Sequence, residues 1–594
     1  MISNKFIYLR NYSPKLFIMK KIYRILLVVL FVFSTGIAKA DFVSVNTAQT
    51  AATKYLSFKG VTNSLTLVHT EYVGTTEMFY VFDIMGGGHI IISADDRMEP
   101  IRAYVPDENY IANSDNPGIA VWKYWHEKYF IDSIISTTQT TRKISEWDFF
   151  TSPSNNQSVP MITVGPLMNS IWNQSRSCEN SIVVANTAAS VPVGCVATAY
   201  GQIMNYYQHP YQGNGSSSYT EPANTNSSGV VTTPSYGTLS TTHSSNQFDW
   251  DNMSQSTNST GTFCTTGDDV AQLLYDLGVS FSMDYSPSGS GTNTSNAKGD
   301  LIDHFGFDDD ANYDLFTNYS TQNAWENMLQ AELDASRPMV YRGRMICGTS
   351  TCGHAWVCDG YDITGSAETF HFNWGWGGNQ GWYASPMNQT VASGSTTGST
   401  STSNFSGGNS VVRSLFPGTD LYNDPAIQSY SANTLTIRVR NDFGNGSESS
   451  DSRCNPYTVK FYASINTTIT EYDEYLTSYF DGNGLPGNGT YQTITRTIDP
   501  STYTSILAGN YYIGWIIDSE DEVWERNENN NKGYISSTVY FPGQPDLEIT
   551  NEHYSIVLCP PPCTITTPPV SVSGTTISYN VEVTNTGTAS SGST

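Results

Sequence analysis

The stretch VPVGCVATAYGQIMNYYQHP, residues 191–210, places Cys195 directly after a glycine and at the start of a helical pattern. Apolar and aromatic side chains recur at helical spacing after the cysteine, and His209-Pro210 ends the pattern. Cys195 is therefore expected on the first turn of a helix, where unpaired N–H groups and the helix dipole lower the pKa of a thiol. A thiolate in this position can attack a carbonyl carbon. The competing interpretation is a small buried cysteine, which is the commoner fate of a lone cysteine.

A base for this thiol is available in GHAWVCDGYD, where His354 begins an alternating strand, and the strand ETFHFNWGWGG follows. A two-residue loop near Thr364-Gly365 pairs Trp356 with Asn373 and places His354 on the same face. The Asn373 amide would then accept the imidazole N–H and complete a Cys-His-Asn arrangement. A shift of one residue in register presents Trp374 instead, and the sequence leaves both possibilities open.

Composition and charge indicate an acidic protein with several domains. The chain has 594 residues, of which 38% are hydrophobic, so about three to five domains are expected from length. The net charge of -26, from 54 acidic and 28 basic residues, argues against nucleic acid as a partner. Phosphate binding depends on clustered Lys and Arg, which an acidic chain of this kind does not favour.

The N-terminus has the pattern of a signal peptide over residues 1–40. Basic residues between 20 and 24 precede the apolar run Ile25–Phe33, and Ala38-Lys39-Ala40 forms an A-x-A cleavage site. We therefore expect a secreted or cell-surface protein. The run Ile25–Phe33 is too short for a membrane span, and no other candidate of about 20 apolar residues is present. No transmembrane span is therefore expected after removal of the signal.

The chain has nine cysteines, an odd number, so in an exported protein at least one thiol lacks an intramolecular partner. Cys347 with Cys352, or Cys559 with Cys563, can pair locally, although the sequence does not fix the connectivity. The sequence contains neither an HExxH motif nor a paired CxxC set. We therefore expect neither a metal nor a cofactor.

Patterns along the chain predict an α+β fold with β-sandwich domains at the C-terminus. The first α+β unit is followed by the polar linker SPSNNQSVP, and helices then precede strands in the second unit, as in helices packed on an antiparallel sheet. Short strands with turn residues between them then indicate β-sandwiches. The expected units are residues 41–158, 159–417, 424–542 and a truncated second sandwich at 545–594. Two segments poor in apolar residues, 211–245 and 393–410, are expected to be surface loops.

Several of these segments together resemble one family. GCVATAYGQIMNYYQHP, GHAWVCDGYD and FHFNWGWGG are similar to the nucleophile, histidine and tryptophan-rich segments of the streptopain-like cysteine peptidases, a branch of the papain superfamily. The resemblance spans about residues 41–417 with its motifs in the same order. It implies a papain-like peptidase domain that hydrolyses protein or peptide substrates.

The resemblance also implies roles for individual residues. Cys195 is the expected nucleophile and His354 the general base and acid, with Asn373 or Trp374 orienting the imidazole. Gln174, in SIWNQS, is expected to form the oxyanion hole with the backbone N–H of Cys195, since donors aimed at the tetrahedral oxygen stabilise it. The loop SMDYSPSGSGT is similar to the substrate-side loop of the family. The substrate-binding residues expected from the resemblance are Met283, Ser286, Ser288, Gly353 and Trp376.

The flanking regions carry resemblances of their own. MFYVFDIMGGGHIIISADDRMEPIRAYVPD is similar to the inhibitory propeptide of the family, so residues 41–158 are expected to block the cleft until cleavage in the linker; a permanent folding domain is the alternative. The C-terminal sandwich resembles a bacterial cell-adhesion-related domain, with an immunoglobulin-like fold and a surface protein or carbohydrate as its partner. The insert CGTSTC before Gly353 is expected to form a disulfide loop over the cleft. Two other hypotheses are a Cys-His acyl-transfer enzyme, such as a cell-wall amidase or transglutaminase-like protein, and a non-catalytic adhesin.

Overall fold

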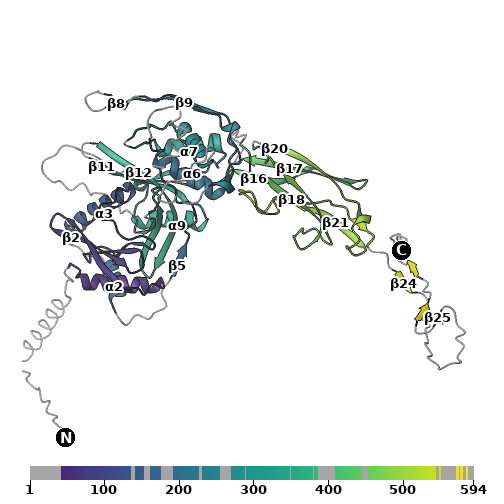
Figure 1. Ribbon diagram of the computed structural model, residues 1–594, viewed down its shortest axis with the longest axis horizontal. Coiled ribbons are helices and arrows are strands. Elements are labelled where there is room, and N and C mark those ends of the chain that lie inside the picture. Colours follow the sequence, from purple (N-terminus) through teal and green to yellow (C-terminus); the bar gives the residue numbers. More distant parts are fainter. Residues whose placement is uncertain are drawn as a thin grey trace, which may run out of the picture.

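The computed structural model of this chain contains a large α+β body, formed by residues between 42 and 418, and an elongated all-β body that follows it (Figure 1). The predicted signal peptide, most of the linker and most of residues 545–594 lie outside the described residues. The structure describes residues 42–135, 141–152, 161–174, 191–225, 231–233, 235–253, 269–287, 289–347, 350–378, 380–385, 408–443, 452–487, 489–543, 547–549, 570–573, 576–579 and 583–585.

One antiparallel sheet runs through the whole α+β body. Its first four strands come from the N-terminal unit, and strand β4 pairs with β14 through Tyr104↔Trp382 and Ala103↔Tyr383. The N-terminal unit therefore extends the sheet that carries His354. The order is β1 (Leu65–Val73), β2 (Thr76–Ile84), β3 (His89–Ser93), β4 (Ile101–Val105), β14 (Gly381–Tyr383), β13 (Ala367–Asn373), β12 (Ser350–Thr364), β11 (Met339–Cys347), β15 (Asn409–Arg413) and β10 (Asn312–Leu315), and β5 (Met161–Val164) also pairs with β12.

Alternation along the central strands assigns the helices to two faces of this sheet. The paired residues Val340 and Val357 join a core with α6 (Cys195–Tyr207), α7 (Asp269–Ser280) and α8 (Thr294–Phe305), and we call this side the α6 face. The paired residues Tyr341 and Trp356 join a second core with α3 (Pro117–Ile135) and α9 (Gln322–Asp334), on the α3 face. Helices α2 (Val45–Phe58) and α4 (Thr141–Thr151) complete a third core with the first strands. The predicted mixed fold, with helices on an antiparallel sheet, is confirmed.

The segment 211–245, expected to be a surface loop, instead forms a two-stranded arm beside helix α7 (Figure 1). Strand β6 (Ser217–Glu221) pairs with β9 (Gly237–Thr241), and β7 (Asn224–Thr225) pairs with β8 (Val231–Thr233). The loop prediction was wrong because a few apolar side chains are enough to anchor these strands on the core. Leu239, for example, is fully buried in the core of the α6 face. Of the second expected loop, all but the end lies outside the described residues, and Asn409 begins strand β15.

The C-terminal body consists of two sheets that share one core. Leu421 and Ile437 from the first sheet meet Phe461 and Trp515 from the second. The immunoglobulin-like topology of this body stays a prediction. The second sandwich, expected at residues 545–594, also stays a prediction, because only four short strands are described in that segment. The first sheet is β16 (Thr419–Ser431), β17 (Thr434–Phe443) and β20 (Thr490–Thr497); the second is β19 (Glu474–Asp481), β18 (Tyr457–Ser464), β21 (Gly509–Ile516) and β22 (Lys532–Tyr534), with β23 (Val539–Phe541) beside β21; the short strands are β24 (Leu547–Ile549), β25 (Val570–Ser573), β26 (Thr576–Tyr579) and β27 (Val583–Asn585).

The two bodies contact each other at the C-terminal end of helix α6. The Trp524 ring lies 4.9 Å from the Tyr207 ring, and the guanidinium of Arg526 lies 3.1 Å from the carboxylate of Asp308. The all-β body is thus packed against the helix that begins at Cys195. Across the residues that the structure describes, no helix is both long and apolar enough to span a membrane.

Candidate active site

Cys195 is the first residue of helix α6, as the sequence predicts. The preceding residue, Gly194, has φ of 94°, a conformation that favours glycine. A Cβ at this position would lie 2.9 Å from the Ser290 carbonyl oxygen and 3.0 Å from Sδ of Met283. The glycine is therefore required for the turn that presents the thiol. Met283, predicted to bind substrate, is fully buried against this turn and is not among the described residues that line the cavity.

The Cys195 thiol is free and partly exposed, and it lines a cavity of about 880 Å³. Burial raises the pKa of this thiol. Hydrogen bonding by the backbone N–H of Ala355, and then by those of Cys195 and Val196, opposes the effect, as does the charge of Arg342. The expected lowering by the helix N-terminus is thus present but outweighed, so the thiol is neutral near pH 7 in this state.

His354 lies on strand β12 with its side chain on the α3 face, and it is only 2% exposed. Its Nε2 lies 2.7 Å from the backbone carbonyl oxygen of Trp374, to which it donates in the corresponding tautomer. Burial lowers the pKa of His354 to about 4, although this hydrogen bond opposes the shift. Both His354 and Cys195 line the cavity, but the described residues show no hydrogen bond between the imidazole and Sγ. The imidazole is therefore neutral, and its described hydrogen bond is to the Trp374 carbonyl rather than to the thiol.

The register of β12 and β13 differs from the predicted one. Asn373 pairs with Val357 rather than with Trp356, because the hairpin loop is Gly365-Ser366 and a bulge follows at Asp359. Since paired residues share a face, Asn373 projects to the α6 face, opposite the imidazole. The expected contact between the Asn373 amide and His354 is absent from the described structure, and the register shift is the physical reason.

Asn373 instead joins a buried hydrogen-bond network with helix α6. Its Nδ2 donates to the Ser170 carbonyl oxygen at 2.6 Å and to Oε1 of Gln202 at 3.1 Å. Gln202 Oε1 also accepts the backbone N–H of Trp172 at 2.9 Å. Gln202 was not predicted as a functional residue, although it lies about two helical turns after Cys195 on the same helix.

This network positions the backbone next to Gln174. The Gln174 N–H donates to the Gly375 carbonyl oxygen at 3.2 Å, and its own carbonyl accepts the N–H of Val193 at 2.9 Å. The backbone of Gln174 is therefore held against the residues that immediately precede Cys195, and Gln174 is 9% exposed. Gln174 is not among the described residues that line the cavity, and its role in an oxyanion hole stays a prediction.

The remaining predicted residues surround the cavity unevenly. Ser286 and Gly353 line it, whereas Ser288 lies outside the described residues. Trp376 is half-buried, its ring centroid lies 6.4 Å from that of His354, and its Nε1 donates to Oδ1 of Asp115 at 3.3 Å. The structure thus brings Trp376 to the imidazole and connects it to the N-terminal unit.

Helix α3 of the N-terminal unit covers His354 directly. A Cβ added at Gly118 would lie 2.3 Å from Cε3 of Trp374 and 3.0 Å from Cδ2 of His354. Asn116 caps the helix, since its Oδ1 accepts the Gly118 N–H at 2.9 Å, and Trp122 Nε1 donates to the Ala384 carbonyl at 3.0 Å. The N-terminal unit is therefore in close contact with the residues that bury the imidazole, with no room for an added methyl group at Gly118.

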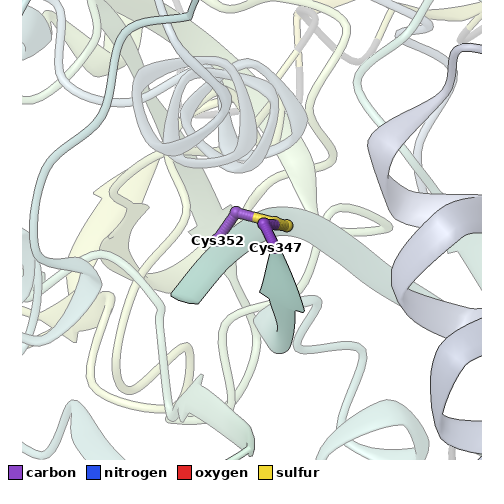
Figure 2. The surroundings of a disulfide bond; sticks show 2 residues. All are labelled: Cys347 and Cys352. Carbon is purple, nitrogen blue, oxygen red and sulfur yellow. A yellow bond between two sulfur atoms is a disulfide. The ribbon is translucent and has the colours of Figure 1, made fainter. Parts of the chain in front are cut away.

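A disulfide joins Cys347 to Cys352 at the end of the β11–β12 hairpin (Figure 2). This is the loop expected from the CGTSTC insert, and Cys352 lines the cavity. The crosslink closes the hairpin just before Gly353 and His354. Apart from Cys195, the cysteines described as free are Cys358 and Cys454, and both are buried.

Comparisons with known proteins agree with this architecture. Residues 172–383 match the peptidase C10 family, and residues 40–130 match the Spi protease inhibitor family. Streptopain from Streptococcus pyogenes serotype M28 (strain MGAS6180) is 27% identical over 304 residues, which cover 50% of this chain and 71% of streptopain. The thiol protease/hemagglutinin PrtT of Porphyromonas gingivalis is 26% identical over 319 residues, or 52% of this chain and 34% of that protein.

Two solved structures are also similar. A fragment of Prevotella intermedia prointerpain A is 25% identical, with a TM-score of 0.44, and the match covers 59% of this chain and 98% of that one. Active wild-type interpain A is 31% identical, with a TM-score of 0.32 and coverage of 37% and 85%. The family matches define a cysteine-type endopeptidase with an inhibitor-like propeptide domain. Residues 172–383 are thus similar to the streptopain-like cysteine peptidases of the peptidase C10 family.

Proposed function

We propose that this chain is the latent form of an exported endopeptidase that cleaves peptide bonds through Cys195 and His354. The observation that carries the proposal is the position of helix α3, whose Gly118 contacts both the His354 imidazole and the Trp374 ring that buries it. A neutral imidazole and a neutral thiol do not form the ion pair that the chemistry needs. The N-terminal unit thus acts as an inhibitor in the same chain.

Removal of the N-terminal unit would expose the imidazole to water and raise its pKa, because burial is the main cause of the present low value. His354 can then take the thiol proton, and the Cys195 thiolate attacks the scissile carbonyl. The imidazolium gives its proton to the leaving amine, and water hydrolyses the acyl-enzyme with the imidazole as base.

The oxyanion of each tetrahedral intermediate would be stabilised by the Cys195 N–H and the Gln174 side chain. Donors fixed in advance stabilise such an intermediate by a few kcal/mol, on the order of 3. We assign orientation of the imidazole to the Trp374 carbonyl, which already accepts from Nε2. Asn373 would instead act as a positioning residue, through its bonds to Ser170 and Gln202.

Export is proposed from the N-terminal sequence, which has a basic segment, an apolar run and an A-x-A site in the order of a signal peptide. Expression in a bacterial host, followed by N-terminal sequencing of the protein in the medium, tests this. A mature protein that begins near residue 41 supports export, and retention of the full chain in the cytoplasm contradicts it.

The catalytic proposal is tested with the Cys195→Ala variant of the full chain. We expect loss of casein hydrolysis and of self-processing, with unchanged thermal unfolding, because only the sulfur is removed. Cys358→Ala is the matched control, since Cys358 is a free cysteine of the same domain outside the cavity. Activity that persists in Cys195→Ala, or that resists thiol alkylation, would refute the nucleophile.

A further inference from the structure

The cavity beside Cys195 has an unusual charge for a chain with a net charge of -26. Two arginines, Arg342 and Arg344, line it on one side, and Asp284 is its only carboxylate among the described residues. The Asp284 side chain already accepts a hydrogen bond from Nδ2 of Asn224 at 3.0 Å. Most of the other lining residues are Ser, Thr, Gly and Asn, which carry no charge. The cavity is therefore locally cationic.

Both arginines belong to strand β11 and share its α6 face, because they alternate with Gly343. Arg342 pairs with Ala355 and Arg344 with Gly353, so they flank His354 in the neighbouring strand but project to the side where helix α6 begins. The strand thus places two guanidinium groups on the same side of the sheet as the nucleophile.

Neither guanidinium has a carboxylate partner within the described part of the chain. Arg342 donates from Nη1 to the hydroxyl of Tyr313 at 3.3 Å, a neutral group. A guanidinium presents N–H groups in a planar fork that fits a carboxylate, and it stays protonated in proteins. The two arginines are therefore available to an acidic ligand.

The field of Arg342 reaches the reacting sulfur, since its charge favours the Cys195 thiolate. Burial, followed by the neighbouring charge of Arg344, lowers the pKa of Arg342. An anion that bound between the two arginines would relieve this repulsion. Because the guanidinium lies close enough to Cys195 to influence it, a peptide whose carbonyl is attacked there brings its adjacent side chains to the same pocket.

We propose that Arg342 and Arg344 form a subsite for an acidic side chain, so that the enzyme prefers peptides with Asp or Glu close to the bond that it cleaves. The inference rests on the proposed peptidase function of Cys195. It adds the chemistry of the substrate and the two residues that recognise it.

The test uses the processed enzyme and pairs of internally quenched fluorogenic peptides. The two peptides of a pair differ at a single position, which is Glu in one and Gln in the other. The positions tested are the two before and the two after the scissile bond. We expect kcat/KM to be at least about tenfold higher for Glu at one position, which corresponds to about 1.4 kcal/mol. The preference should decrease as NaCl is raised, because partly exposed charges are screened.

Variants assign the preference to the two arginines. The Arg342→Gln variant should reduce the Glu/Gln ratio of kcat/KM to near unity while cleavage of the Gln peptide continues. The Arg342→Glu variant should prefer a peptide with Lys at the same position. A gain of cleavage of the Lys peptide cannot result from misfolding. Arg496→Gln, on strand β20 of the C-terminal body, is the matched control and should keep the wild-type preference.

The outcomes separate this inference from the peptidase function. Equal cleavage of every Glu and Gln pair by the wild type would overturn the subsite and leave the peptidase intact. Absence of cleavage of all peptides by a processed enzyme would overturn the peptidase function itself. If Arg342 variants fail to fold, Arg344→Gln decides, since Arg344 is exposed: an unchanged Glu preference overturns the proposal, and a reduced preference supports it.

Discussion

Substitution of Gly118 by alanine should weaken the inhibitory contact of helix α3. The added Cβ would lie 2.3 Å from Cε3 of Trp374, a distance that real contacts do not reach, so the helix or the indole must move. Overpacking of this kind costs about 1–3 kcal/mol, which corresponds to a rise of about 5–150-fold in the fraction of molecules with the helix displaced. We expect the uncleaved variant to process itself faster, and its Cys195 to be alkylated by iodoacetamide faster, by factors in this range.

The control is Gly299→Ala in helix α8, where the added Cβ has no atom within 4 Å. This change should leave alkylation and processing unchanged, because it adds the same methyl group to a helix without a contact. Alkylation is read by intact mass at short times, before processing begins, and thermal unfolding is recorded in parallel. If Gly118→Ala matched the wild type in alkylation, processing and unfolding, helix α3 would not be the element that keeps the enzyme latent.

Two further predictions concern the pH dependence and the buried network. In the uncleaved protein burial raises the pKa of Cys195 and lowers that of His354 to about 4, so alkylation should increase only towards alkaline pH. After processing the imidazole is charged at higher pH than before and stabilises the thiolate, so the alkylation profile should shift to lower pH; an unshifted profile would contradict the proposed displacement of His354. The Gln202→Met variant removes the acceptor for Trp172 and Asn373, so kcat of the processed enzyme should fall about ten- to a hundredfold with little change in KM, and an unchanged kcat would exclude this positioning role.

Local patterns predicted the elements of this fold because each pattern reports on a few neighbouring residues. The helical spacing after Cys195 correctly placed the thiol on the first turn of helix α6. Alternation in the strands and the order of helices before strands predicted the antiparallel sheet and its helical layers. The segment 211–245 was misjudged because its pairing depends on Leu239 reaching a core built by distant helices.

The contacts of His354 show where prediction from sequence stopped. The loop at Gly365-Ser366 and the bulge at Asp359 together decide which face Asn373 occupies, and each changes the register by a whole residue. The pKa of Cys195 was expected to be lowered by the helix N-terminus, yet burial by distant segments dominates it. Arg342 and Gln202 carried no motif, so only their positions beside the cavity and the Asn373 network reveal them.

The sequence by itself determined the order of the units, the helix that begins at Cys195, the strand that carries His354 and the resemblance to the streptopain-like peptidases. These properties depend on spacing along the chain, which is visible without coordinates. Only the tertiary structure decided that His354 lies under Gly118 and that Arg342 lines the cavity. Both depend on strand register and on packing between segments far apart in sequence. The free energies of such contacts depend on which residues the folded chain brings together, and spacing along the sequence does not show this.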